Sequence, residues 1–289
     1  MNKLSNKVAI VTGATKGLGS EVAKKFFQNG AKLALCSRSI KDLIELRDML
    51  VGNDNSSNIL IAEVDISQQQ QVTDFIQAVN NKFGSIDILF NNAGIYGPKG
   101  YFDSCDMDDW VKTIQTNLIG SAYVLKAVIP YMKQKRSGKI IQVAGGGAAS
   151  NFPRFSAYAT SKVGVVRLSE ILSAELKEFG LDINSMAPGF LKTRLLDEVL
   201  NSAPEIVGFE FYEKCLAMKK SNLDCFHMPT ELALFLASND SNGITGKFIS
   251  ANWDAWNLFP NHLTELMSSE IFTLRRIIGK DRNMNLFDL

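Results

Sequence analysis

Short apolar runs rich in β-branched residues alternate with helical patterns along most of this 289-residue chain. The first run, Lys7–Thr12, is largely apolar, as expected for a strand that is covered on both faces. Parallel strands need crossover connections, usually helical, and these are right-handed. We therefore predict an α/β fold, in which helices cover both faces of a doubly wound parallel sheet of about seven strands. The predicted strands are Lys7–Thr12, Lys32–Cys36, Ile59–Asp65, Ile86–Asn91, Lys139–Val143, Leu181–Met186 and Lys247–Ala251, and the predicted helices are Ser20–Asn29, Ile40–Val51, Gln68–Phe83, Asp108–Met132, Ser156–Phe179, Leu195–Leu200, Glu205–Lys219 and Thr230–Ser238.

The alternation is interrupted at two places late in the chain. Residues 194–228 carry exposed-looking aromatic side chains at Phe209, Phe211 and Tyr212, and residues 252–289 follow the last predicted strand. The sequence shows no internal repeat, low-complexity tract or linker, which favours a single domain. We expect residues 1–251 to form that domain, with 194–228 inserted as a lid. Residues 252–289 are expected to be an extension packed on the domain or on a partner subunit.

The composition limits the possible partners. Hydrophobic residues make up 46% of the chain, enough for a substantial core, and 31 basic residues balance 30 acidic ones to a net charge of +1. This balance gives no reason to expect a nucleic acid or an anionic membrane as partner. Four cysteines without metal-ligand spacing indicate reduced thiols of a cytoplasmic protein, and no apolar run is long enough to span a membrane. His227 and His262 are far apart in the sequence, so we predict neither a histidine triad nor a metal site.

A glycine-rich loop, Gly13-x-x-x-Gly17-x-Gly19, joins the first predicted strand to its helix. Glycines at this place let backbone N–H groups approach a pyrophosphate at the N-terminus of the helix. The spacing differs from the commoner G-x-G-x-x-G, so the position between a strand and a helix is what supports the interpretation. The sequence therefore predicts a Rossmann-type dinucleotide site.

A tyrosine and a lysine stand four residues apart in Tyr158-Ala-Thr-Ser-Lys162. In a helix both side chains lie on one face, one turn apart. A fixed ammonium favours the phenolate, and such a tyrosine can donate or accept a proton near neutral pH. Taken alone, such a pair is more often an ordinary surface contact of a helix.

Five motifs occur in order along the chain: Thr12-Gly-x-x-x-Gly-x-Gly19, Asn91-Asn-Ala-Gly94, Asn117, Tyr158-x-x-x-Lys162 and Pro188-Gly189. In this order and spacing the chain resembles the classical short-chain dehydrogenases/reductases over most of its length, up to the last predicted strand. The resemblance implies a nicotinamide-dependent oxidoreductase. Such an enzyme moves a hydride between the nicotinamide ring and the carbon of a carbonyl or secondary alcohol.

The resemblance also implies roles for single residues. Tyr158 is the expected acid–base, and Lys162 is expected to hydrogen-bond the nicotinamide ribose and, with the cationic ring of the oxidised cofactor, to lower the pKa of Tyr158. Asn117 is expected to hold a water that relays protons from Lys162 to solvent; the alternative is a satisfied asparagine within a helix. The implied cofactor contacts are Gly13, Thr15, Lys16, Gly17, Leu18, Gly19, Ser37, Arg38, Asp65, Ile66, Asn91, Ala93, Gly94, Tyr158, Lys162, Pro188, Gly189 and Thr193.

The choice between the two nicotinamide dinucleotides depends on charge. An acidic residue at the end of the second strand would bind the ribose 2′-hydroxyl and repel a 2′-phosphate. Ser37 and Arg38 stand there instead, and Lys16 lies inside the glycine loop. Two cations without a carboxylate favour the phosphate through charge-assisted hydrogen bonds, so we predict NADP(H) over NAD(H). In the alternative interpretation both cations are solvated surface charges.

One catalytic position departs from the family pattern. The family's serine stands thirteen residues before the tyrosine, and this position is Gly145 here. The backbone of Gly145–Gly147 or a bound water can replace the hydroxyl, or the substrate's own hydroxyls can do so. Alternatively, the chain has lost catalysis and is a cofactor-binding sensor or assembly partner. We favour an active enzyme because Tyr158, Lys162 and Asn117 all remain.

The expected substrate is a small molecule, bound under the segment that follows the sixth strand. The pattern GGGA…PRFSAYATSK and a tryptophan-rich ending also resemble a subgroup associated with bacterial surface-sugar biosynthesis. This resemblance suggests a sugar or a sugar nucleotide. Members of the family commonly pair through the helices that correspond to Asp108–Met132 and Ser156–Phe179, so we expect a homodimer or homotetramer.

Overall fold

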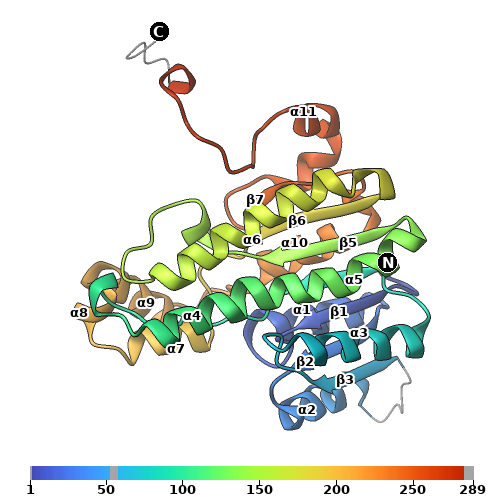
Figure 1. Ribbon diagram of the computed structural model, residues 1–289, viewed down its shortest axis with the longest axis horizontal. Coiled ribbons are helices and arrows are strands. Elements are labelled where there is room, and N and C mark those ends of the chain that lie inside the picture. The colour runs from blue at the N-terminus through green and yellow to red at the C-terminus, as the bar shows by residue number, and fades with distance from the viewer. Residues whose placement is uncertain (1, 53–57, 283–289) are drawn as a thin grey trace.

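The computed structural model describes residues 2–52 and 58–282, in which seven parallel strands form one sheet (Figure 1). The strands are β1 Val8–Thr12, β2 Lys32–Ser37, β3 Ile59–Glu63, β4 Ile88–Asn91, β5 Gly138–Val143, β6 Leu181–Ala187 and β7 Phe248–Ser250. Their order is β3-β2-β1-β4-β5-β6-β7, which reverses between β1 and β4 and creates a topological switch point there. The predicted doubly wound parallel sheet is confirmed. The end of the predicted extension lies outside the described residues.

Helices cover both faces of this sheet. They are α1 Gly17–Gln28, α2 Ile40–Val51, α3 Gln69–Phe83, α4 Met107–Ile114, α5 Ser121–Lys135, α6 Ser156–Glu175, α7 Arg194–Leu200, α8 Pro204–Val207, α9 Phe209–Lys220, α10 His227–Ala237 and α11 Leu263–Ser268. Side chains alternate along β1: Ala9 and Val11 join the core under α1, α2 and α10, whereas Val8 and Ile10 join the core under α3, α5 and α6. Within the described ranges, no helix has the length and apolar character needed to cross a membrane.

Predicted helices are interrupted in the structure at two places near the cleft and the segment that follows β6. The stretch predicted as one helix over Asp108–Met132 contains a π-helical turn, Gln115–Gly120, between α4 and α5. Such a turn widens the helical repeat and changes which side chains face inward, and Asn117 within it is fully buried. The stretch predicted over Glu205–Lys219 divides into α8 and α9 at Gly208, whose φ of 89° is in the left-handed region that glycine adopts easily.

Helices α7, α8 and α9 gather at one end of the molecule and share a small apolar core (Figure 1). This core includes Leu196 and continues into the main domain through Phe155. Of the three aromatic residues expected to be exposed, only Phe209 is mostly exposed. Phe211 and Tyr212 pack against this core instead, because a short helical segment needs apolar side chains to hold it to the domain.

The described part of the C-terminal extension packs on the domain. Trp256 joins the core beside α10: its ring centroid lies 5.3 Å from that of Phe235, and its indole N–H donates to the carbonyl oxygen of Ala251. Further along, the carbonyl oxygen of Phe272 accepts a 2.7 Å hydrogen bond from the amide of Phe248 in β7. The extension therefore completes one core and covers part of the edge strand.

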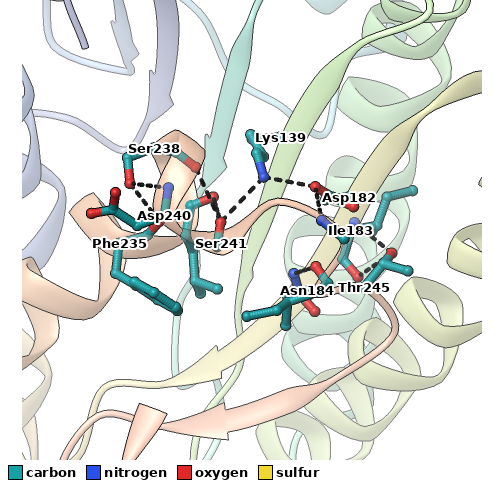
Figure 2. Close-up of polar contacts among 12 residues, drawn as sticks. Lys139, Asp182, Ile183, Asn184, Phe235, Ser238, Asp240, Ser241 and Thr245 are labelled. Atoms are coloured by element: carbon teal, nitrogen blue, oxygen red, sulfur yellow. Dashed lines mark hydrogen bonds and ion pairs between the residues drawn. The ribbon is translucent and has the colours of Figure 1, made fainter. Parts of the chain in front are cut away.

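A polar cluster joins the amino ends of β5 and β6, opposite the carboxyl ends of the strands. The Lys139 Nζ donates to Asp182 Oδ2 at 2.6 Å and to the Ser241 hydroxyl at 3.2 Å (Figure 2). Burial lowers the pKa of Lys139, and the nearby Asp182 carboxylate opposes that shift. The cluster satisfies a buried cation and connects two strands to the turn before β7, so we assign it a structural role.

Trp256→Ala is expected to lower the free energy of unfolding by about 3–5 kcal/mol, because it leaves a cavity in the core. Trp253→Ala is the matched control, since the Trp253 side chain is 88% exposed and that of Trp256 only 9%. The control is expected to change stability by less than about 0.5 kcal/mol. Urea denaturation followed by circular dichroism measures both changes. Equal losses in the two variants would contradict the packing of the extension on the domain.

Candidate active site

A cleft of about 370 Å³ opens at the carboxyl ends of β1, β4, β5 and β6. It extends from the glycine loop and the end of β2 to the start of α6 and helix α7. Most of the site residues predicted from the sequence are brought together in its walls. They are Gly13, Thr15, Lys16, Gly17, Leu18, Ser37, Arg38, Asp65, Ile66, Ala93, Gly94, Tyr158, Lys162, Pro188, Gly189 and Thr193.

The glycine loop is packed so closely that side chains are excluded from it. A Cβ on Gly13 would lie 2.9 Å from the Cα of Ala93, and one on Gly19 would lie 2.2 Å from the Gly13 carbonyl oxygen. Helix α1 begins at Gly17, and the residue before it, Lys16, provides no side-chain cap for the first amides. These open N–H groups fit the pyrophosphate of a dinucleotide.

The two asparagines at the end of β4 face different surroundings. Asn91, expected to line the cleft, is buried and hydrogen-bonds the Thr12 hydroxyl and the backbone of Ser121. Its side chain points to the α5 face because side chains alternate along a strand. Asn92 lines the cleft instead, and its Nδ2 donates to the carbonyl oxygens of Thr12 and Gly13 at 3.0 and 3.2 Å. The Asn91 side chain therefore lies outside the cleft walls, and its contact with a cofactor stays a prediction, whereas strand alternation is the signal that identifies Asn92.

Tyr158 and Lys162 lie one turn apart on α6, and both line the cleft. The Lys162 Nζ is 5.8 Å from the centroid of the Tyr158 ring and donates a 2.7 Å hydrogen bond to the carbonyl oxygen of Val143. Burial raises the pKa of Tyr158 to about 12 and lowers the pKa of Lys162 to about 8. Desolvation of the phenol is the cause of the raised pKa of Tyr158 in this structure, and the lowering expected from Lys162 together with the oxidised cofactor stays a prediction. A neutral phenol is the form that donates a proton.

Asn117 lies behind Lys162, outside the cleft walls. Its Oδ1 accepts from the amide of Ile95 at 2.9 Å, and its Nδ2 donates to the Ile95 carbonyl oxygen at 2.9 Å and to the Ser161 hydroxyl at 3.0 Å. A Cβ on Gly94 would lie 3.2 Å from Asn117 Oδ1 and 3.5 Å from Lys162 Nζ. The amide therefore ties the segment after β4 to α6. Its function as a water-binding relay stays a prediction.

Gly145 lies directly beside the Tyr158 hydroxyl. A Cβ built on Gly145 would be 3.0 Å from the Tyr158 oxygen, so a side chain at this position would point at the phenol. The φ of 171° at Gly145 is extended backbone that any residue adopts. A 3-10 turn, Gly146–Ala148, follows, and the first amides of such a turn have no acceptor within it.

A carboxylate lies at the end of the cleft beside β2, where the sequence indicated cations alone. Asp42, in the first turn of α2, forms an ion pair in which its Oδ2 is 3.0 Å from the Lys16 Nζ. The hydrogen bond from Lys16 is the main cause that lowers the pKa of Asp42. Arg38 also lines the cleft. The end of β2 thus holds Ser37 and Arg38, as the sequence indicated, but Asp42 adds a carboxylate to this part of the cleft from the first turn of α2.

A doubly wound sheet, with a glycine cradle and a tyrosine–lysine pair in one cleft at its switch point, defines a dinucleotide-dependent oxidoreductase. The family model described as short chain dehydrogenase matches residues 7–203, and the chain belongs to this family. It is accordingly an oxidoreductase that binds a nicotinamide cofactor, NAD or NADP, and acts on small molecules.

Known proteins resemble the chain over most of its length. The oxidoreductase UcpA of Escherichia coli (strain K12) is 33% identical over 248 residues, which cover 85% of this chain and 93% of UcpA. The crystal structure of levodione reductase matches with a TM-score of 0.76 at 25% identity and covers 89% of this chain and 99% of that chain. The structure of NAD⁺-bound xylitol dehydrogenase matches with the same TM-score and identity and covers 86% and 98%.

Lys162→Met is expected to stabilise the protein at pH 7 by roughly 1–3 kcal/mol, because it replaces a buried ammonium by an apolar side chain. The pKa of Lys162 is about 8 in the folded protein against 10.5 ordinarily, so the unfolded chain binds more protons between these values. The stability of the wild type therefore rises with pH across this range, and the advantage of the variant shrinks.

Urea unfolding at neutral pH and near pH 10 measures this effect. Lys126→Met, which replaces an exposed lysine on α5, is the matched control and should change stability little at either pH. A Lys162→Met variant that is less stable than the wild type at pH 7 would contradict the interpretation of Lys162 as a costly buried amine.

Proposed function

We propose that the chain is an NADP(H)-dependent oxidoreductase that interconverts a carbonyl and a secondary alcohol on a small molecule. The observation that carries this proposal is that Tyr158 and Lys162 line the same cleft as the glycine loop. When bound, the nicotinamide dinucleotide supplies or takes up the hydride. The similar solved structures are named as a reductase and a dehydrogenase, which are the two directions of such a reaction.

In the proposed reaction Tyr158 moves the proton at the substrate oxygen. A phenol whose pKa is about 12 is protonated at neutral pH and can donate to a carbonyl oxygen as the hydride arrives at the carbon. Lys162 hydrogen-bonds the nicotinamide ribose and, when charged, stabilises the phenolate that remains. Asn117 positions the segment beside Lys162 and holds the water that relays protons to it.

We also propose that Gly145 stands where the family has its catalytic serine, an assignment supported by the direction of its Cβ toward the Tyr158 oxygen. Loss of one such donor costs about 3–4 kcal/mol in other enzymes, roughly a hundred- to a thousandfold in rate. The amides at the start of the Gly146–Ala148 turn, or hydroxyls of the substrate, take over this function in the proposal. The alternative is a catalytically impaired cofactor-binding protein that acts as a sensor or an assembly partner.

NADP(H) is proposed over NAD(H) because Lys16 and Arg38 both line the cleft beside the end of β2. In this fold the adenosine ribose binds at the end of the second strand, where a 2′-phosphate would meet these cations. Asp65 and Ile66, which line the same part of the cleft, are the proposed adenine neighbours.

The substrate pocket is proposed to lie between Tyr158 and the lid, where aromatic side chains are plentiful. The Tyr96 ring lies 4.8 Å from the Tyr158 ring, and Phe190 lines the cleft at the start of the lid. These walls favour a substrate with an apolar face next to its carbonyl. A sugar or sugar nucleotide of surface polysaccharide synthesis stays the proposed class of natural substrate, on the basis of the sequence pattern alone. Ketones without hydroxyl groups are assayed together with keto-sugars for this reason.

A homodimer or homotetramer is proposed to form through α4, α5 and α6. Met107 and Val111 on α4, and Val163 and Ile171 on α6, are exposed apolar side chains that a partner copy would cover. A cytoplasmic location is proposed because all four cysteines are free thiols.

Tyr158→Phe is expected to lower the rate of carbonyl reduction by at least about a hundredfold, because it removes the hydroxyl that donates the proton. Binding of NADPH, measured by nicotinamide fluorescence, should stay within about threefold of the wild type, since the phenol hydroxyl acts mainly in the transition state. The assay follows NADPH absorbance with a panel of ketones and keto-sugars.

Tyr101→Phe is the control for this substitution, because the Tyr101 side chain is exposed and lies outside the cleft walls. It should leave both rate and binding unchanged. If the wild type and Tyr158→Phe give the same background rate with every compound while NADPH still binds, the oxidoreductase proposal fails and the cofactor-binding alternative stands.

Gly145→Ser is expected to slow turnover by about tenfold, because its Cβ would crowd the Tyr158 oxygen in a site where the backbone already serves. Gly146→Ser is the matched control, since a Cβ on Gly146 meets no atom within 4 Å. Steady-state kinetics on the best compound of the panel compares the two variants. Faster turnover in Gly145→Ser would show that the serine's function is unfilled in the natural chain.

A further inference from the structure

The ion pair between Lys16 and Asp42 joins two walls at one end of the cleft. Lys16 belongs to the glycine loop before α1, Asp42 belongs to the first turn of α2, and both line the cleft together with Ser37 and Arg38. The end of the second strand is the place where a doubly wound fold receives the adenosine ribose of a dinucleotide. The pair therefore lies where a 2′-hydroxyl and a 2′-phosphate are distinguished.

The neighbouring hydroxyls at this place already have partners in the protein. The Ser37 hydroxyl donates to the carbonyl oxygen of Ser39 at 3.2 Å, and the Ser39 hydroxyl accepts from the amide of Asp42 at 3.3 Å. Arg38 is exposed and forms no ion pair within the described part of the chain. The charged side chains that line this part of the cleft are thus Lys16, Arg38, Asp42 and Asp65, and Lys16 and Asp42 are paired with each other.

The Asp42 carboxylate and a 2′-phosphate would compete for the Lys16 ammonium. A phosphate monoester carries about −1.5 to −2 charges at pH 7. Lys16 lowers the pKa of Asp42, so the carboxylate is ionised as well and repels a second anion. The Lys16 side chain is 68% exposed, and exposed ion pairs are weak enough to exchange for a more highly charged partner.

We propose that Asp42 is a specificity-determining residue that competes with the 2′-phosphate of NADP(H) for Lys16. This inference rests on the proposed function and deepens it. NADP(H) exchanges the Lys16–Asp42 pair for a Lys16–phosphate pair, whereas NAD(H), with a hydroxyl at that position, leaves the pair intact. Asp42 therefore lowers the ratio of the affinities for NADP(H) and NAD(H). Without Asp42, Lys16 and Arg38 would give a stronger preference for NADP(H).

The test compares dissociation constants of NADPH and NADH, measured by nicotinamide fluorescence, for the full chain and its variants. Asp42→Asn is expected to tighten NADPH binding about tenfold and to change NADH binding by less than about threefold. Lys16→Gln is expected to weaken NADPH binding about tenfold. In the Lys16→Gln background, Asp42→Asn should change NADPH binding clearly less than it does with Lys16 present, by no more than about threefold, because the contested ammonium is absent and only the screened repulsion between carboxylate and phosphate remains.

Asp48→Asn is the matched control for the loss of a carboxylate from α2. Asp48 is paired with Arg47 at 2.8 Å and lies outside the cleft walls, so both dissociation constants should match those of the wild type. Thermal unfolding of each variant verifies that the fold is kept, which we expect because Lys16 and Asp48 are exposed and Asp42 is partly exposed.

An Asp42→Asn variant whose ratio of the two dissociation constants stays within about twofold of the wild type, or shifts toward NADH, overturns the inference. An undiminished effect of Asp42→Asn in the Lys16→Gln background overturns it as well. If the wild type binds neither dinucleotide, the proposed function fails and the inference with it. Binding of both dinucleotides with an unchanged ratio overturns the inference alone.

Discussion

The close packing of the glycine loop against the end of β4 is the constraint on which the rest of the site depends. Gly13 and Gly19 leave no room for side chains, and the Asn92 amide donates to two carbonyl oxygens of the β1 end and the loop. Because β1 and β4 are the strands between which the order reverses, this contact places the cleft at the switch point. The open amides of α1, the first turn of α2 and the start of α6 then face one space.

The part of the cleft that contains Tyr158 and Lys162 lowers the stability of the fold. Lys162 is a buried amine, 4% exposed, whose hydrogen bond to the Val143 carbonyl oxygen offsets only part of its desolvation. Asn117 turns inward within a π-helical turn and bonds to Ile95 and Ser161, which fixes the surroundings of the lysine. Ionisable groups whose pKa values are strongly shifted by burial are typical of binding and catalytic sites. The family assignment is consistent with such a site at Lys162.

The alternation of apolar runs and helical patterns predicted the sheet and its two covered faces, because apolar periodicity reports burial directly. Motif positions predicted most of the cleft walls. Asn92 was not predicted because the sequence alone does not show which of the two neighbouring asparagine side chains faces the cleft. Asp42 was not predicted because its ion pair depends on the distance between two separate elements, and the raised pKa of Tyr158 depends on burial that only tertiary packing provides. The turn at Asn117 was not predicted because one π-turn hardly changes the helical pattern.

Hydride transfer to a carbonyl carbon, with Tyr158 as the proton donor and Gly145 in place of a hydroxyl donor, is the central claim. Label transfer tests it most directly: NADPH deuterated at both positions of the nicotinamide C4 is incubated with the wild-type chain and carbonyl compounds, and mass spectrometry follows the products. We predict an alcohol that carries one deuterium on the former carbonyl carbon. Tight binding of the labelled NADPH without a labelled alcohol from any compound would contradict the claim.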